Sequence, residues 1–104
     1  MLTQALLPYT PPSSRIINIS SVGALVVFPS LSLYCSSKAA LEWMARCWAA
    51  ELGHNRTTVN CMNPSPLQSE MLHNIPKDIV EGQKNRTPVE NRLGTKEEVA
   101  NVTA

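Results

Sequence analysis

Glycine is scarce in this sequence. Only four of the 104 residues are glycine, and neither G-x-x-x-G-x-G nor G-x-G-x-x-G occurs. The chain therefore has no glycine-rich turn that could hold a phosphate group at a helix N-terminus. Long hydrophobic runs are also missing, since no segment approaches the about 18 apolar residues that a membrane-spanning helix needs. The first residues, MLTQALLPYTPPSS, lack the basic flank and apolar core of a signal peptide. We expect a cytoplasmic protein without a membrane partner.

An excess of one charge is absent as well. The formal net charge is +1, and lysine and arginine are scattered along the chain, which gives no reason to expect nucleic acid as a partner. The three cysteines have no metal-ligand spacing, and His54 and His73 have no ligand partners at a useful distance along the chain. The sequence thus predicts reduced cysteines and no metal site.

Hydrophobic patterns predict a strand, a long helix and a second strand. The β-branched run RIINIS, residues 15–20, has apolar residues on both faces and predicts a buried strand of a parallel sheet. Ser30 or Ser32 would cap a helix that reaches about Leu52, and Gly53 would end it. The segment TTVNCM, residues 57–62, predicts the second strand, which the Asn-Pro turn ends.

Shorter elements are predicted on either side of this unit. Residues 2–9 form a short helical end before the proline-containing loop, and residues 69–74 and 77–85 form short helices. Thr95 followed by Glu98 matches a capping box for a last helix. Strand, helix, strand is one βαβ crossover of a doubly wound parallel sheet, so the fold class is α/β. Two strands alone do not make a stable sheet of this kind. The pattern therefore predicts that these elements are part of a larger sheet.

The head of the long helix, YCSSKAALEWM, places Tyr34 and Lys38 four residues apart. On a helix these side chains lie one above the other on the same face. The pair is either an acid/base pair or the start of an ordinary amphipathic helix whose apolar stripe is Leu41, Met44, Ala45, Trp48 and Leu52. The stripe itself predicts that one side of the helix is buried.

Three segments together resemble the second half of a short-chain dehydrogenase/reductase. They are RIINISSVGA, YCSSK thirteen residues after Ser21, and TTVNCMNPSPLQSEM, and the similarity runs from Leu2 to the closing RLGTKEEVANV. The resemblance implies a partial Rossmann-like domain over residues 1–104, which lacks the N-terminal dinucleotide-binding half and the C-terminal strand. It also implies an NAD(P)(H) cofactor and a small-molecule substrate that is interconverted between carbonyl and alcohol.

The resemblance also assigns roles to three residues. Tyr34 would be the general acid/base, and Lys38 would favour its phenolate form and bind the nicotinamide ribose. Ser21 would hold the substrate oxygen. Ser20 is the alternative serine, but it lies one residue closer to the strand and breaks the family spacing. Asn63 is interpreted as a satisfied turn amide.

The turn NPSPLQSEM resembles the family turn that packs against the nicotinamide. Pro64, the backbone of Leu67 and the hydroxyl of Ser69 match positions that contact the carboxamide. Ser65 stands where the family usually has glycine, and it would strain the turn if that position requires a positive φ.

Two functions in different classes remain open. One is an oxidoreductase that forms a homo-oligomer, a dimer or tetramer, in its full-length form. The other is a truncated, non-catalytic remnant that pairs with full-length relatives through residues 2–9 and Ser32–Leu52. A serine hydrolase is disfavoured, because there is no G-x-S-x-G motif. Trp43 and Trp48 are interpreted as packing residues of the core or of a subunit interface.

Overall fold

The computed structural model describes residues 2–104, and its centre is one βαβ unit. The strands β1 (Arg15–Ile19) and β2 (Thr58–Met62) pair in parallel, with Arg15 beside Thr58 and Ile19 beside Met62. The 21-residue helix α2 (Ser32–Leu52) connects them. The predicted order of elements and the partial α/β fold are confirmed.

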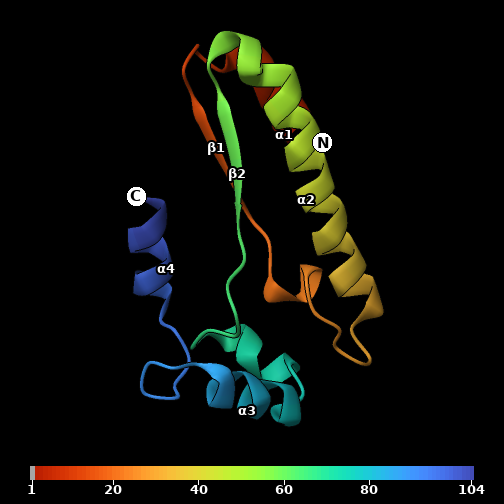
Figure 1. Ribbon diagram of the computed structural model, residues 1–104, viewed down its shortest axis with the longest axis vertical. Helices are drawn as coiled ribbons and strands as arrows, with labels where there is room; N and C mark the ends of the chain where they lie inside the picture. Colours follow the sequence, from red (N-terminus) through yellow and green to blue (C-terminus); the bar gives the residue numbers. More distant parts are fainter. Residues whose placement is uncertain (1) are drawn as a thin grey trace.

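Helix α2 packs along one side of the strands (Figure 1). Its buried residues include Ala45 and Trp48, which form a small core with Val59 of β2. Ile16, Met44, Ala49, Leu52 and Cys61 pack against this cluster and are partly buried. The predicted apolar stripe is thus the packing face of the helix, as its spacing of three and four residues indicates.

The remaining elements lie around this unit (Figure 1). Helix α1 (Leu2–Leu6) precedes β1, and α3 (Lys77–Arg86) lies beyond the carboxyl ends of the strands. Helix α4 (Lys96–Thr103) lies on the other side of the strands from α2. Its N-terminus has the predicted capping box, in which the Thr95 side chain accepts from the Glu98 amide and the Glu98 side chain accepts from the Thr95 amide.

The prediction that residues 15–20 form a buried strand is wrong in its burial. Residues of β1 alternate between exposed and half-buried, and Ile17 and Ile19 keep 42% and 47% of their surface accessible. Within residues 2–104 the sheet has two strands, so β1 has a hydrogen-bonded neighbour on one edge only. The continuous apolar pattern is typical of a strand that is covered on both faces. The elements within residues 2–104 do not cover both faces of β1.

The predicted N-cap of α2 is also wrong, whereas its predicted end is confirmed. Leu31 occupies the N-cap position without a side-chain hydrogen bond, and Ser32 is already inside the helix. Ser30 lies in the turn before it with a φ of 69°. At the other end the helix stops at Leu52 with Gly53 as its C-cap, as predicted. Gly53 keeps a right-handed φ of −59° and begins a 3₁₀ turn that ends at Arg56, whose φ is 67°.

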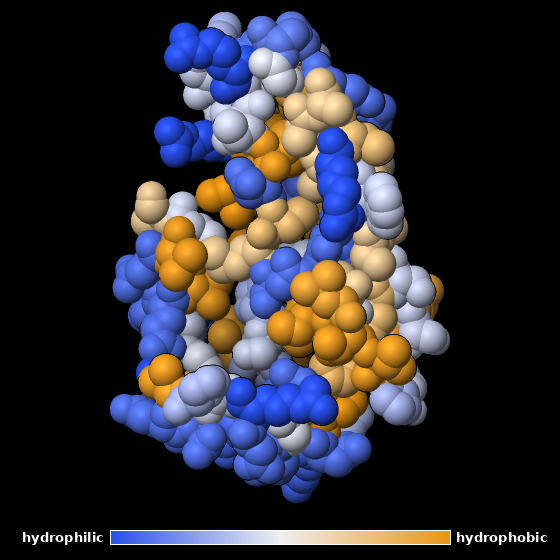
Figure 2. Space-filling view, in the orientation of Figure 1, coloured by the Kyte–Doolittle hydropathy of each residue, from blue (hydrophilic) through white to orange (hydrophobic). Residues whose placement is uncertain are grey.

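The molecule is open for its length. Its accessible surface is 7459 Å², whereas a compact monomer of the same mass exposes about 5,800 Å². Its radius of gyration is 15.6 Å, compared with about 13 Å for a compact domain of this size. Figure 2 shows apolar side chains gathered on the surface in the middle and lower part of the view. Large apolar side chains therefore remain exposed, among them Leu33 at 85% and Trp43 at 67%.

The cysteines are all free thiols, as predicted. Cys35 and Cys61 are half-buried, and Cys47 is exposed. Burial, together with the nearby charge of Glu42, raises the pKa of the Cys61 thiol. No helix within residues 2–104 has the length and apolar character needed to cross a membrane.

Candidate active site

The candidate site lies where both strands end and α2 begins. Because α2 runs back along the strands, its first turns reach the carboxyl ends of β1 and β2 (Figure 1). In parallel α/β sheets this edge is where ligands bind. Backbone pairing continues past both strands, since Ser20 N donates to Met62 O at 2.7 Å and Val22 N donates to Pro64 O at 3.2 Å. The segments that carry the predicted site residues are therefore held side by side.

Ser21 and Tyr34 both lie beside Gly23. Ser21 is buried, and its Oγ accepts a hydrogen bond from the Gly23 amide at 3.1 Å. A Cβ at Gly23 would lie 3.5 Å from Ser21 Oγ, 3.5 Å from Tyr34 Cε1 and 3.1 Å from Cys35 Sγ. Glycine thus leaves open the space between the serine hydroxyl and the tyrosine ring.

Lys38 lies one helical turn after Tyr34, and its ammonium group reaches the end of β1. Nζ is 5.9 Å from the centroid of the Tyr34 ring and donates to the carbonyl of Ile19 at 2.9 Å. An ammonium group has three hydrogens, so two remain for other acceptors. The structure therefore brings the predicted residues Ser21, Tyr34 and Lys38 to one end of the sheet. Tyr34 is exposed to solvent there.

Ser20 is directed away from this space. Its hydroxyl donates to Oε1 of Glu42 at 2.9 Å, and only 4% of the residue is exposed. Ser21 is consequently the serine that faces Tyr34, in agreement with the spacing of the sequence.

The turn after β2 is fixed at both ends. Asn63 Nδ2 donates to the carbonyl of Ser21 at 2.9 Å, which confirms its interpretation as a satisfied turn amide. Further along, Leu67 forms an isolated parallel bridge with Gly94, and Gln68 N donates to Gly94 O at 3.0 Å. Ser69 is half-buried at the N-cap of the 3₁₀ turn Glu70–Asn74.

Ser65 does not strain the turn. The non-glycine residues with positive φ within residues 2–104 are Ser13, Ser30, Arg56, Glu90 and Asn91. The backbone at Ser65 thus lies outside the left-handed region, and a residue with a Cβ is accommodated there. The condition under which serine would distort the turn is not met.

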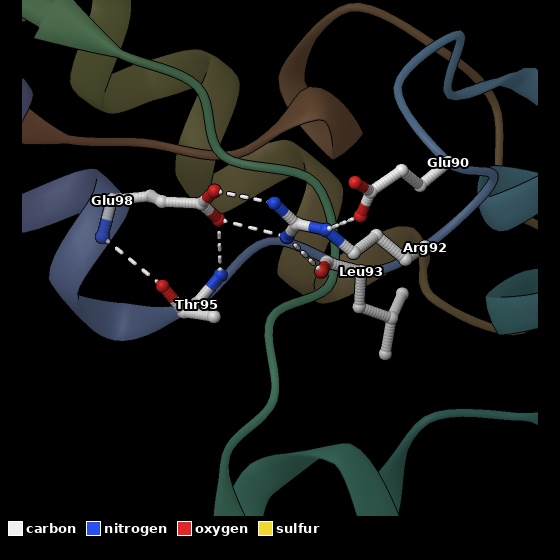
Figure 3. Close-up of polar contacts among 5 residues, drawn as sticks. All are labelled: Glu90, Arg92, Leu93, Thr95 and Glu98. Atoms are coloured by element: carbon white, nitrogen blue, oxygen red, sulfur yellow. Dashed lines mark hydrogen bonds and ion pairs between the residues drawn. The ribbon is translucent and has the colours of Figure 1, made fainter.

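An ion-pair cluster supports the segment that pairs with Leu67 (Figure 3). Arg92 Nη2 contacts Glu98 Oε1 at 2.7 Å, and Arg92 Nε contacts Glu90 Oε2 at 2.8 Å. Arg92 Nη1 also donates to the carbonyl of the buried Leu93 at 3.0 Å. The hydrogen bonds from Arg92 and from the Thr95 amide lower the pKa of Glu98 to about 2. The cluster therefore connects the start of α4 to the segment beside Leu67.

Sequence reasoning missed the connection made by Glu42. Glu42 lies four residues after Lys38 and four before Arg46, a spacing that favours ion pairs with both. The pair with Arg46 forms, with Nη2 4.0 Å from Oε2, whereas Lys38 bonds to the Ile19 carbonyl. Glu42 Oε1 instead accepts from Ser20 and from Asn63 Nδ2. The available signal was the position of Glu42, on the helix face that also carries Tyr34 and Lys38.

The site fits one part of a nicotinamide coenzyme. The turn that begins with Asn63 lies beside Ser21, and the Lys38 ammonium has hydrogens free to bind a ribose hydroxyl. The sequence contains no glycine-rich turn for the pyrophosphate. The residues present therefore match the nicotinamide and its ribose, but not the rest of the coenzyme. Residues 2–104 also contain no group of three or more histidine, cysteine, aspartate or glutamate side chains placed to hold a metal ion.

Comparison with known proteins identifies the family of this chain. The family model described as enoyl-(acyl carrier protein) reductase matches residues 1–104. The short-chain dehydrogenase/reductase FrzI of Cladobotryum sp is 40% identical over 110 residues, which cover 99% of this chain and 43% of that protein. The L-xylulose reductase of Aspergillus niger is 38% identical over 106 residues, which cover 95% of this chain and 35% of that protein.

A solved structure of the same family also resembles this chain. The short-chain dehydrogenase/reductase from Serratia marcescens BCRC 10948 is 30% identical and superposes with a TM-score of 0.83. The match covers 96% of this chain and 40% of that chain. The chain thus spans less than half of the length of each of these relatives.

Proposed function

This chain belongs to the short-chain dehydrogenase/reductase family of oxidoreductases, and we propose that it carries the catalytic half of an NAD(P)(H)-dependent enzyme that interconverts a carbonyl and an alcohol. The observation that carries the proposal is the placement of Ser21 and Tyr34 on two sides of Gly23, with Lys38 one turn along the same helix. In this proposal the dinucleotide-binding half of the domain would lie within the length of the relatives that this chain does not span.

The proposed mechanism assigns one role to each residue. Ser21 Oγ donates a hydrogen bond to the substrate oxygen and holds it toward Tyr34. In the reducing direction the Tyr34 hydroxyl gives its proton to that oxygen, and in the oxidising direction the phenolate takes the proton back. Lys38 places its positive charge 5.9 Å from the centroid of the Tyr34 ring. When bound, NAD(P)(H) would be the source or the acceptor of the hydride. Pro64, Leu67 and Ser69 would hold the nicotinamide carboxamide, and Lys38 would hold the ribose.

Substitution of Tyr34 tests the function directly. In a form of the protein that turns over, Tyr34→Phe removes the proton donor and should abolish turnover while coenzyme affinity stays nearly unchanged. Tyr9→Phe is a matched control, because Tyr9 is 82% exposed in the N-terminal segment. Retained turnover in Tyr34→Phe would show that the acid/base assignment is wrong.

Coenzyme binding by the 104 residues alone tests whether the other half of the domain is needed to bind NAD(P)(H). Without a pyrophosphate-binding turn, the chain should show no measurable NAD(P)H binding in a fluorescence titration. Micromolar affinity would contradict the proposal that the other half of the domain is needed.

Exposed apolar helix faces favour a second candidate. Leu33 and Trp43 of α2, and Leu2 and Leu6 of α1, are exposed. In a full-length enzyme these faces would form the contacts of a homo-oligomer, whereas in a non-catalytic remnant they would pair with full-length relatives. The intact mass in the native source separates the two. A mass well above 11.4 kDa supports the enzyme, and a mass of that size supports the remnant.

A further inference from the structure

Glu42 stands out because it is buried and charged. It is 8% exposed, and among the buried residues of the described part of the chain it is the one with an ionisable side chain. It follows Lys38 by four positions and Tyr34 by eight, so the three side chains lie along one face of α2. A buried carboxylate needs hydrogen-bond donors, because desolvation of its charge is costly.

The donors come from the ends of both strands. Glu42 Oε1 accepts from Ser20 Oγ at 2.9 Å and from Asn63 Nδ2. The same Asn63 nitrogen also donates to the carbonyl of Ser21 at 2.9 Å. One carboxylate oxygen therefore connects α2 to the residue before Ser21 and, through Asn63, to Ser21 itself.

A second connection lies one turn earlier on the same helix. Lys38 Nζ donates to the Ile19 carbonyl at 2.9 Å. Three consecutive residues at the end of β1, Ile19 to Ser21, are thus bound directly or through Asn63 to one face of α2. This face carries Tyr34 at its N-terminal end, so sliding or rotation of the helix would break these bonds and change the separation of Ser21 and Tyr34.

We propose that Glu42 is a positioning residue, which acts through Ser20 and Asn63 to hold Ser21 opposite Tyr34. The proposal rests on the proposed function only in treating Ser21 and Tyr34 as the reacting pair. The arrangement of the two side chains can be measured without turnover. Failure of the catalytic assignment and failure of the positioning role therefore give different results.

The test uses NMR of the 104-residue chain with labelled tyrosine and glycine. A Cβ at Gly23 would lie 3.5 Å from Tyr34 Cε1, so an NOE between the Gly23 α-hydrogens and the Tyr34 ring reports the position of the ring beside Ser21. Glu42→Ala should weaken this NOE severalfold. Glu42→Gln should keep it, because the amide oxygen can still accept from both donors. Glu51→Ala is the matched control, since Glu51 is an exposed glutamate on the same helix.

A second variant separates loss of positioning from loss of fold. Asn63→Ala leaves the helix intact but removes the bonds to Ser21 O and Glu42 Oε1, so it should weaken the NOE as Glu42→Ala does. Far-ultraviolet circular dichroism checks that α2 is present in each variant. An undiminished NOE in both Asn63→Ala and Glu42→Ala would overturn the proposal, as would equal loss in Glu42→Gln and Glu42→Ala.

Turnover gives an independent measurement. In a form that turns over, Glu42→Ala should lower kcat roughly 10- to 100-fold, as small misplacements of reacting groups do, and should change the KM for coenzyme little. Glu42→Gln should restore most of kcat. A purely structural role would instead predict losses that follow the unfolding midpoint, with no recovery specific to glutamine. If Tyr34→Phe keeps its turnover but Glu42→Ala loses the NOE, the catalytic assignment fails and the positioning role stands.

Discussion

The hydroxyl of Ser20 donates to Oε1 of Glu42 at 2.9 Å, so the first of two adjacent serines points into the contact between helix and sheet. The second, Ser21, uses its Oγ as an acceptor for the Gly23 amide, so its hydroxyl hydrogen is available for the substrate oxygen of the proposed reaction. Two neighbouring residues of the same type therefore have different tasks, which are set by the alternation of side chains at the end of the strand.

Alanine substitutions should separate the two serines. Ser21→Ala removes the hydrogen bond to the substrate oxygen and should lower kcat/KM by at least about tenfold, which corresponds to one hydrogen bond of about 1.4 kcal/mol. Ser20→Ala removes a buried hydrogen bond, so it should lower the free energy of unfolding by about 1 kcal/mol and reduce turnover less than Ser21→Ala does. Steady-state kinetics and urea unfolding measure both. A larger loss of turnover in Ser20→Ala would reverse the assignment.

A methyl group at Gly23 should crowd the site. Its Cβ would meet Cys35 Sγ at 3.1 Å and would enter the space between Ser21 and Tyr34. Gly23→Ala should therefore cost about 1–3 kcal/mol of unfolding free energy through overpacking, and it should also lower turnover. Cys35→Ala in the same chain relieves the contact with sulfur, so the double variant should recover part of the stability in a double-mutant cycle. Because the new methyl group still lies 3.5 Å from Ser21 Oγ, turnover should recover less than stability. Additive effects on stability would contradict the close contact.

The two tryptophans should differ in their effect on stability. Trp48 is 8% exposed in the core, whereas Trp43 is 67% exposed with the Arg46 guanidinium 4.8 Å above its ring. Trp48→Ala should cost about 3–5 kcal/mol, which leaves little folded protein in a chain with so small a core. Trp43→Ala should cost less than about 1 kcal/mol, because an exposed cation–π contact is weak. Urea unfolding followed by circular dichroism measures both, and equal losses would contradict the assigned packing.

Acid should release the N-terminus of α4. The Arg92 and Thr95 contacts lower the pKa of Glu98 to about 2 from an ordinary value of 4.5. Since the pKa is depressed in the folded state, the stabilisation is fully present above pH 4.5 and is lost as the pH falls toward 2. The protection factors of the amides at the start of α4, which correct for the intrinsic pH dependence of exchange, should therefore fall over this interval. Glu98→Gln should remove most of this pH dependence, whereas Glu97→Gln, at an exposed position of the same turn, should leave it in place.

The sequence predicted those features that depend on local spacing. The parallel βαβ unit follows from two β-branched runs around a long amphipathic segment, and the capping box of α4 follows from Thr95 and Glu98. The N-cap of α2 was not predictable in the same way, because Ser30 and Ser32 are both acceptable N-caps by residue type. In the structure Leu31 takes this position, and its amide donates to the Phe28 carbonyl of the preceding loop at 3.2 Å.

The residues of the candidate site were easier to predict than the hydrogen bonds between them. Ser21, Tyr34 and Lys38 were found from motif spacing, and the structure places them at one end of the sheet. The hydrogen bond from Lys38 to the Ile19 carbonyl was not predictable, because a flexible lysine could also reach Glu42. The donors to Glu42, Ser20 and Asn63, are brought beside it only by the tertiary fold. Residue type cannot reveal which of two possible partners lies nearer.

The open surface of this chain has a consequence for how it unfolds. The dependence of unfolding free energy on denaturant and the heat capacity of unfolding both scale with the surface newly exposed. A chain that already exposes 7459 Å² when folded has less left to expose than a compact domain of equal length. Its urea transition should therefore be broad, and its stability curve should be unusually flat with temperature. If further strands and helices covered this chain, more surface would become exposed on unfolding, so its urea transition would be steeper.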